Sequence, residues 1–295
     1  MEKLAPVGYN SRMRTLDLKS LTSHRARTFN LPPCSPISTS AQALKFVNTS
    51  GYIFFWPIKG IVFPSLWTAV AGDRPVPDDH DDPAHITWRW KDEALDKRLW
   101  YYAKVLRGKA TLISLEIAPY FYALSENYGS PEEDYLIAYE EGRLTQAAKQ
   151  VYETILNHGP LHTIDLRRKA RLANARESEF NKALEVLQRD FKILPVGVAE
   201  AGAWRYAFIY EITARYYPAL PEQAHHIGEA QARETLLNLY FEAVGAAPLP
   251  AVNKLFGWGP ELTRRTLIRM VEGETLTEAV HPSMPGTWYT SPSLC

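Results

Sequence analysis

The chain has 295 residues, of which 46% are hydrophobic and 22% are charged, and its formal net charge at pH 7 is zero. This composition excludes a disordered or fibrous protein, and the length is sufficient for two or three small domains. The zero net charge also excludes a protein that is basic throughout, so a nucleic-acid-binding surface would require local segregation of positive charge.

Membrane and secreted proteins are disfavoured by the residue pattern. No apolar run reaches the roughly 18–20 residues that a membrane-spanning helix needs, and Met1–Leu4 lacks the hydrophobic core of a signal peptide. Cys34 and Cys295 are far apart and show no metal-ligand spacing. We therefore expect a cytoplasmic protein, associated with the nucleoid when DNA is bound, that holds no metal.

Residues 1–140 are expected to form an N-terminal helical, winged-helix-like region. Leu18–Phe29, which contains Arg25 and Arg27, is expected to form a helix. A second helix is expected to run towards Asn48, with Ser38 or Thr39 as its N-cap. The region therefore begins with two short helices.

Aromatic and β-prone residues follow these helices. The run Tyr52–Pro57, which comes directly after Gly51, is too continuously apolar for an exposed strand. Arg98–Leu106 and Ala110–Ile117 are expected to pair as a hairpin around the turn Arg107-Gly108-Lys109. The region thus combines helices with an aromatic-rich hairpin.

The loop at Asp78–Asp82 is rich in acidic residues. Its four carboxylates surround His80, a combination of ligands that could hold a divalent cation. Contiguous acidic residues cannot all turn towards one ion unless the loop is built for it, and the ligand order of an EF-hand is absent. We interpret the segment as a solvated acidic loop.

Three tryptophans, Trp88, Trp90 and Trp100, lie beyond this loop. Aromatic side chains near basic elements stack on unpaired bases in some nucleic-acid-binding proteins. They fill hydrophobic cores more often, so core packing is the favoured interpretation and base stacking the alternative. Farther along, Ser130 is expected to cap a helix that ends at Gly142.

Residues 141–218 are expected to form a central winged helix. A first helix with apolar residues at helical spacing ends at Gly159-Pro160. Thr163 is expected to cap a second helix, and Asn174 a third. Two β-prone runs complete a helix, helix, helix, hairpin order. The third helix is expected to carry a core stripe of apolar residues, namely Phe180, Ala183, Leu184, Leu187 and Phe191.

Basic residues concentrate in this segment and favour DNA binding. In a winged helix the third helix usually enters the major groove, while neighbouring elements hold phosphates. The alternative is a solvated helix face on a protein-interaction module. The predicted DNA-binding residues are Arg167, Arg168, Lys169, Arg171, Arg176, Lys182, Arg189 and Arg205.

An internal repeat predicts a further unit at residues 219–280. Residues 151–161 align without gaps to residues 239–249, so that Pro160 meets Pro248 and Leu161 meets Leu249. This similarity favours a second helix-turn-helix-like module with a shortened wing. Residues 281–295 are rich in Pro and Ser and are expected to be an irregular tail. The predicted fold class is α+β and mainly helical, with tandem winged-helix modules and small β-hairpins.

The order of these elements resembles a known family. Ser23-His24-Arg25-Ala26-Arg27 in an N-terminal helix, a Ser/Thr-capped helix, Gly51 with its hydrophobic run, and the central winged helix are similar to the AlkZ/YcaQ-type winged-helix DNA glycosylases. The resemblance covers roughly residues 16–280. It implies a tandem winged-helix scaffold that excises alkylated or cross-linked bases from double-stranded DNA in base-excision repair.

The catalytic motif of that family is missing from the sequence. The resemblance implies Gln-hydrophobic-Gln or Gln-hydrophobic-Asp shortly after a Gly, but Tyr52–Pro57 contains neither Gln nor Asp. Phe and Trp cannot deprotonate water. Asp73, Glu116 and Lys59 lie nearby, but no partner spacing singles one out, so the catalytic residues are unknown.

Two functions therefore remain open. The first is a DNA-binding repair protein related to DNA glycosylases, and the second is a non-catalytic DNA-binding or regulatory protein. Phosphate-binding loops, dinucleotide-binding glycines, nucleophile elbows and Cys/His zinc patterns are absent from the sequence. We therefore expect no small-molecule cofactor.

Overall fold

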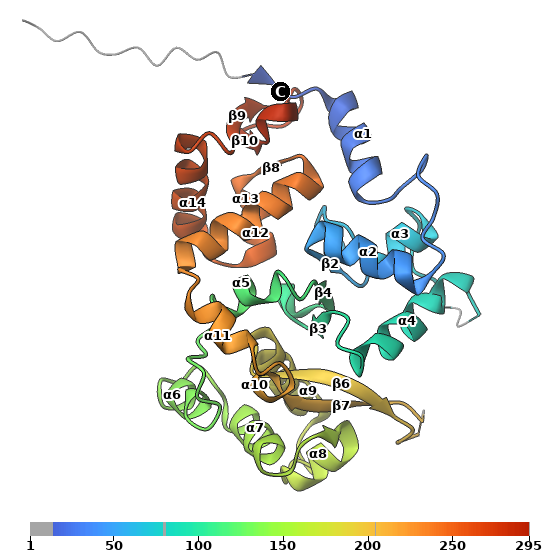
Figure 1. Ribbon diagram of the computed structural model, residues 1–295, viewed down its shortest axis with the longest axis vertical. Helices are drawn as coiled ribbons and strands as arrows, with labels where there is room; N and C mark the ends of the chain where they lie inside the picture. Colours follow the sequence, from blue (N-terminus) through green and yellow to red (C-terminus); the bar gives the residue numbers. More distant parts are fainter. Residues whose placement is uncertain (1–13, 79–80, 204, 295) are drawn as a thin grey trace, which may run out of the picture.

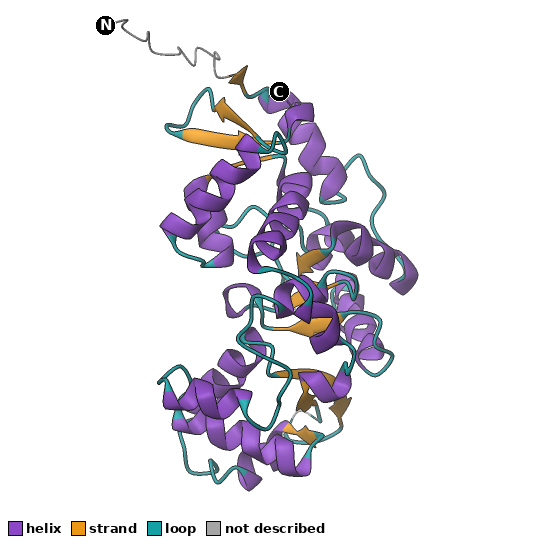
Figure 2. Ribbon diagram, turned by 60° about the vertical axis from the view of Figure 1, so that its left-hand side comes forward, coloured by secondary structure: helices purple, strands orange, loops and turns teal. Residues whose placement is uncertain are grey.

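The computed structural model describes residues 14–78, 81–203 and 205–294. The fold is α+β and mainly helical, with three small sheets (Figures 1 and 2). Three units follow one another in the chain. Apart from two short 3-10 helices in the first unit, each has the same order of helix, strand, helix, helix, strand, strand. In each sheet the third strand of the unit lies between the other two.

The first unit occupies the right-hand middle of Figure 1. Its sheet has the order β2-β4-β3 and is antiparallel throughout. α2 begins with a capping box, in which Thr39 and Gln42 exchange side-chain to backbone hydrogen bonds. The elements are α2 (Ser40–Ser50), β2 (Tyr52–Phe54), α3 (Leu66–Ala71), η1 (Pro83–His85), α4 (Ile86–Leu95), β3 (Tyr101–Ala103), η2 (Leu106–Gly108) and β4 (Thr111–Ile113).

The central unit has the order predicted for the winged helix, with one added short strand. It lies at the bottom of Figure 1, and its sheet has the order β5-β7-β6. Its elements are α7 (Gln146–His158), β5 (Leu161–His162), α8 (Thr163–Lys169), α9 (Glu177–Arg189), β6 (Ile193–Ala199) and β7 (Ala207–Ile212). Two helices precede it, α5 (Ala118–Tyr122) and α6 (Asp134–Glu140).

The third unit lies at the top of Figure 1 and repeats this order. Its sheet, β9-β10-β8, is extended by β1 (Arg14–Thr15), which pairs in parallel with β9. The elements are α12 (Glu229–Val244), β8 (Ala246–Pro248), α13 (Leu249–Phe256), α14 (Pro260–Glu272), β9 (Thr277–Val280) and β10 (Thr287–Thr290). The remaining helices are α1 (Leu18–Thr28), α10 (Thr213–Tyr216), α11 (Leu220–His225) and η3 (Pro292–Leu294).

Two predictions for the C-terminal region need correction. Residues 281–295 are not an irregular tail, because they contain β10, which pairs with both β8 and β9. Such a short strand is defined by its partners rather than by its own residues. The ungapped repeat is also out of register by two residues, since Leu249 begins α13 whereas the corresponding helix, α8, begins at Thr163 and not at Leu161.

The predicted cap of α8 is wrong by one residue. Thr163 is the first helical residue, and the preceding His162 is the cap, whose ring nitrogen accepts a hydrogen bond from the backbone N–H of Asp165 at 3.4 Å. α6 likewise begins at Asp134 rather than directly after Ser130. The carboxylate of Asp134 accepts from the backbone N–H of Ser130 at 3.2 Å and holds that turn.

The predicted cap of α9 is wrong as well. α9 begins at Glu177, and Asn174 does not cap it. The reason lies in Arg167, whose guanidinium donates to the carbonyl oxygens of Leu172 at 3.1 Å and Ala175 at 2.7 Å. These two bonds fix the turn between α8 and α9, so the helix starts two residues later than an Asn174 cap would require.

The position of β2 between two hydrophobic cores explains why its sequence is continuously apolar. Tyr52 and Phe54 point into a core shared by the first and third units, and Ile53 and Phe55 point into a second core within the first unit. Both faces of the strand are therefore buried, as in a central strand of a layered fold. The Tyr52 hydroxyl donates to the carbonyl oxygen of Leu236 in α12 at 2.7 Å.

Phe191 joins the central unit to the shared core. It follows α9 with a positive φ of 54°, and its ring stacks on Tyr101 at 4.5 Å between centroids with an interplanar angle of 15°. Phe121 stacks nearly parallel to it at 6.2 Å. The rest of the predicted α9 stripe lies in the central unit's own core, so Phe191 does not belong to that stripe.

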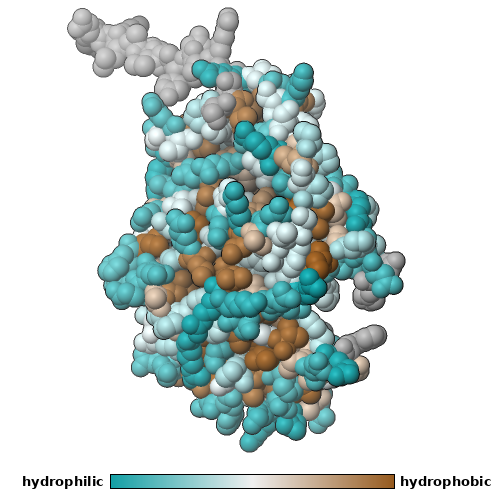
Figure 3. Space-filling model, turned by 45° about the vertical axis from the view of Figure 1, so that its right-hand side comes forward, coloured by the Kyte–Doolittle hydropathy of each residue, from teal (hydrophilic) through white to brown (hydrophobic). Residues whose placement is uncertain are grey.

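The outer surface is mixed in character. The face in Figure 3 is largely hydrophilic, with hydrophobic patches near the middle of the molecule. Within the described residues, no helix combines the length and the apolar composition needed to cross a bilayer.

Phe191→Ala should destabilise the protein by about 3–5 kcal/mol, because it empties a buried aromatic site and leaves the strained backbone in place. Chemical denaturation measures the loss. Ile137→Ala, at an exposed position of α6, serves as the control and should change the free energy of unfolding by less than about 0.5 kcal/mol. Equal effects of the two substitutions would contradict the anchoring role of Phe191.

His24 should make the stability depend on pH. Its Nε2 donates to the carbonyl oxygen of Glu242 at 2.8 Å, and burial, together with the charges of Arg27 and Arg25, lowers the pKa of His24. Since the unfolded chain then binds a proton more readily, the stability present above about pH 6.5 is lost as the pH falls towards the folded-state pKa. On acidification, the urea midpoint of His24→Gln should fall less than that of wild type. An identical fall would exclude His24 as a source of the pH dependence of stability.

Candidate nucleic-acid interface

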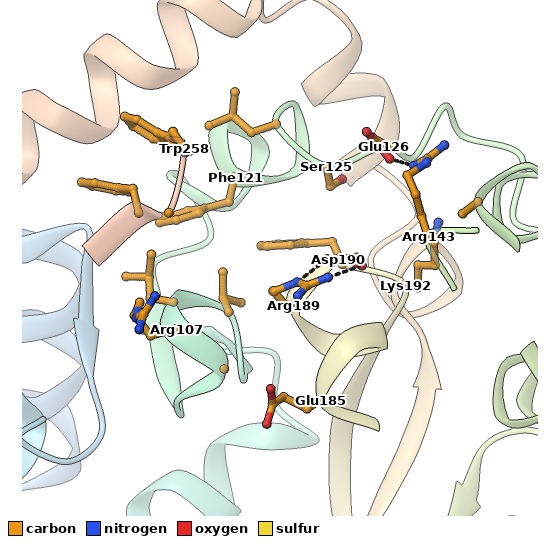
Figure 4. Close-up of a pocket in the computed structure, with 18 of the residues that line it drawn as sticks. Arg107, Phe121, Ser125, Glu126, Arg143, Glu185, Arg189, Asp190, Lys192 and Trp258 are labelled. Atoms are coloured by element: carbon orange, nitrogen blue, oxygen red, sulfur yellow. Dashed lines mark hydrogen bonds and ion pairs between the residues drawn. The ribbon is translucent and has the colours of Figure 1, made fainter. Parts of the chain in front are cut away.

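All three units contribute to one cavity of 780 Å³ at the centre of the molecule. Its walls come from η2 of the first unit, the end of α9 in the central unit, and the end of α13 with the following turn in the third (Figure 4). Phe121, Phe191, Phe256 and Trp258 supply aromatic surface. We call this cavity the central cleft.

The central cleft also contains seven charged residues, and most of them are paired. Arg189 donates to both carboxylate oxygens of Asp190, at 2.7 and 3.0 Å, and Arg143 pairs with Glu126. Figure 4 shows both pairs on the same side of the cleft. A polyanion entering here would meet cations whose charge is already partly neutralised.

Lys192 is the buried cation of the central cleft. Its Nζ donates to Asn127 Oδ1 at 2.8 Å, and Asn127 in turn donates to the carbonyl oxygen of Asp190 at 2.7 Å. Only 4% of Lys192 is exposed, and burial lowers the pKa of its ammonium group. Lys192 therefore ties the loop between α5 and α6 to the end of α9.

Arg107 differs from the other cations of the cleft. It is exposed at the tip of the first unit's hairpin, in a left-handed conformation with φ of 58°. Within residues 14–78, 81–203 and 205–294, no side chain forms an ion pair or hydrogen bond with its guanidinium. The hairpin that carries Arg107 was predicted, but its approach to α9 was not.

The close approach depends on Gly108. A Cβ on this residue would lie 2.7 Å from Glu185 Oε1, and its φ of +65° already disfavours other residues. Glu185 is held by Lys182, whose Nζ donates to Oε1 at 2.6 Å. A side chain at position 108 would therefore require the Glu185 side chain to move away from the hairpin.

The predicted DNA-binding residues do not form a single patch. Arg168, Lys169 and Arg171 are exposed around the end of α8, and Arg176 is exposed at the start of α9. Arg189 lies at the other end of α9 in the central cleft, about 20 Å away for a 13-residue helix. The structure therefore separates a basic turn between α8 and α9 from the cleft.

Several predicted contacts have intramolecular partners, including Arg168, which pairs with Asp165 at 2.8 Å. Arg167 braces the turn between α8 and α9 through its two backbone hydrogen bonds. Lys182 pairs with Glu185, and Arg205, on the loop between β6 and β7, pairs with Glu200. The Arg205 side chain is nevertheless 79% exposed, so it stays accessible on the wing.

The remaining candidate residues lie elsewhere. Asp73, Glu116 and Lys59 are exposed, and none of them lines the central cleft. In the acidic loop, Asp79 and His80 lie outside the described residues. Asp82 pairs with Arg74 at 2.8 Å and accepts a hydrogen bond from the backbone of Ala84, which lowers the pKa of its carboxyl.

No metal site emerges from the part of the chain that the structure describes. There, no group of three or more His, Cys, Asp or Glu side chains is close enough together to hold an ion.

The described chain consists largely of three units with the same order of helices and strands, each containing a small sheet. The profile of the family described as "AlkZ related" matches residues 37–257, well over half of the sequence, and the chain belongs to this family. It is also similar to the solved structure of the Streptomyces sahachiroi DNA glycosylase AlkZ, with a TM-score of 0.60 and 14% identity. The similarity covers 95% of this chain and 71% of that chain. No curated protein matches the sequence.

The packing of Gly108 against Glu185 can be tested with a matched pair of variants. Gly108→Ala and Gly142→Ala both place alanine at a positive φ, which costs about 1–2 kcal/mol. Only the alanine at 108 also meets a side chain, because nothing lies within 4 Å of a Cβ at 142. Thermal unfolding should show a larger loss for Gly108→Ala; equal losses would mean that the hairpin does not press on α9.

Proposed function

We propose that this protein binds double-stranded DNA and acts in the repair of damaged bases. One observation carries the proposal: α9, the third helix of a winged-helix-like unit, runs from an exposed basic turn to a cleft that all three units line. Membership of the AlkZ-related family and a fold similar to that of a DNA glycosylase support it. The damaged base would be an alkylated or cross-linked one.

Phosphate contacts are proposed at the exposed cations. Arg168, Lys169, Arg171 and Arg176 surround the turn between α8 and α9, where they can approach a DNA backbone without burial. Arg205 would act from the wing, and Arg107 from the edge of the central cleft. Four of these cations would first have to exchange a carboxylate partner for phosphate, namely Arg168, Lys182, Arg189 and Arg205. Arg167 is assigned instead to bracing the turn.

A second candidate function is recognition of DNA without base excision. The segment after Gly51 favours it, because Tyr52–Phe55 are all at most 2% exposed and the Tyr52 hydroxyl is engaged by Leu236. Tyr52 and Phe54 hold the first and third units together, and Ile53 and Phe55 fill the core of the first unit. None of these side chains can activate water. The carboxylates of the central cleft are paired with cations, which leaves no obvious general base among the described residues there.

An Arg168→Ala/Lys169→Ala/Arg171→Ala variant should bind DNA more weakly than wild type, and its affinity should depend less steeply on salt concentration. Each lost phosphate contact lowers the slope of log K against log salt by roughly 0.9, so the slope should fall by about two to three. The control, Lys19→Ala/Lys45→Ala/Lys97→Ala, removes the same charge from exposed sites on and near α1, α2 and α4. If both variants titrate like wild type by fluorescence anisotropy, the basic turn is not the binding surface.

Base release separates the two candidate functions. Wild type is incubated with duplex DNA that carries an N7-alkylpurine or a cross-link, and the freed base is quantified. Release faster than the spontaneous rate is expected for the first function, and release at the spontaneous rate for the second. A duplex of the same sequence without the lesion serves as the control.

A further inference from the structure

A second cavity, of 480 Å³, lies in the first unit beside the wing of the central unit. Three rings line it: Trp56 and Trp88, whose centroids are 6.1 Å apart, and His85, which stands perpendicular to Trp56 at 6.2 Å. The rest of the lining is Val76, Pro77 and Asp78. We call this cavity the tryptophan pocket.

Trp88 is unusual among the tryptophans. It is 43% exposed, whereas Trp67, Trp90 and Trp100 are at most 5% exposed and belong to the core. Core packing thus explains two of the three tryptophans singled out in the sequence, Trp90 and Trp100. Trp88 presents an aromatic face to solvent at the mouth of a pocket. Core packing does not account for this exposed position.

The inner side of Trp88 is firmly supported. The Lys91 ammonium lies 5.3 Å from its ring centroid, and Tyr206 of the wing lies 6.1 Å from it. Lys91 is 2% exposed, donates to the Tyr206 hydroxyl at 2.8 Å and pairs with Asp92 at 2.8 Å. This buried cluster joins the first unit to the wing and fixes the orientation of the indole, so a flat ligand would meet a preformed surface.

Exposed cations lie on the elements that surround the pocket. Arg205 immediately precedes Tyr206 on the wing and is 79% exposed, and Arg89, which follows Trp88 on α4, is 67% exposed. Arg74 is 41% exposed in the loop that leads to Val76. Each of the three cations is paired with a carboxylate, which a phosphate would have to replace. Aromatic faces flanked by cations are the combination by which proteins hold unpaired nucleotides, with the rings stacking on bases and the cations meeting phosphates.

We propose that the tryptophan pocket binds an unpaired or extruded base of DNA, stacked on Trp88. The volume lies within the range of pockets that hold a small planar ligand, and the polar group at its rim, Asp78, could accept a hydrogen bond from an amino group of a base. This inference rests on the proposed DNA binding but concerns a different surface from the basic turn. It gives the protein a preference for DNA in which one base is out of the stack.

The test measures the binding of three probes by wild type, Trp88→Ala and Trp88→Phe. The probes are a fully paired duplex, the same duplex with one bulged 2-aminopurine, and a short single-stranded oligonucleotide. Tyr128→Ala, which removes a 74% exposed aromatic ring from a different loop, is the matched control. Binding is followed by anisotropy, and the environment of the bulged base by 2-aminopurine fluorescence.

Wild type and Tyr128→Ala should bind the bulged duplex and the single strand and quench 2-aminopurine. Trp88→Ala should bind both probes roughly ten-fold more weakly, the effect of losing one stacked base, and should quench less. Trp88→Phe should recover part of the loss, and the paired duplex should bind all variants alike.

The outcomes separate the two proposals. Equal binding of the bulged and single-stranded probes by wild type and Trp88→Ala, or no binding of either probe by wild type, would overturn the pocket assignment. Failure to bind the paired duplex, with Trp88-dependent binding of the single strand retained, would overturn the proposed duplex binding and leave the pocket standing.

Discussion

The stacking of Phe191 on Tyr101 and Phe121 is the contact on which the arrangement of the three units depends. Phe191 follows α9 of the central unit, Tyr101 belongs to the sheet of the first, and the same core contains α12 and α13 of the third. Its backbone is in the left-handed region, which costs a branched or aromatic residue roughly 1–3 kcal/mol. Burial of the ring offsets a strain of that size. Phe191 can therefore occupy a turn in which glycine would otherwise be expected.

The central cleft is a consequence of this contact. Because Phe191 pulls the end of α9 into the shared core, Arg189, Asp190 and Lys192 lie beside the first unit's hairpin and the end of α13. In an isolated winged helix the whole outer face of the third helix would be free for DNA. Here only its beginning is free, and its end forms a wall between units.

The two sides of β2 illustrate how a stable assembly limits chemistry at the same place. Tyr52 and Phe54 bind the first unit to the third, and Ile53 and Phe55 complete the first unit's core. A polar pair in this strand would bury unpaired groups in two cores at once, at a cost of several kcal/mol. The first side chain of this segment that is only partly buried is Trp56, which lines the tryptophan pocket.

The sequence by itself determined the local elements of this protein. Helical spacing located α7 and α9, Ser38 or Thr39 was expected to cap α2, and the runs on either side of Arg107–Lys109 were expected to form a hairpin. These signals act between residues a few positions apart. What only the tertiary structure decided depends on partners distant in the chain. These are the strand β10, the cap of α9 displaced by Arg167, the assignment of Phe191 to the shared core, and the division of the basic residues into an exposed turn and a cleft. A sequence records which side chains are apolar or charged, but burial against another unit decides which of them remain exposed at the surface.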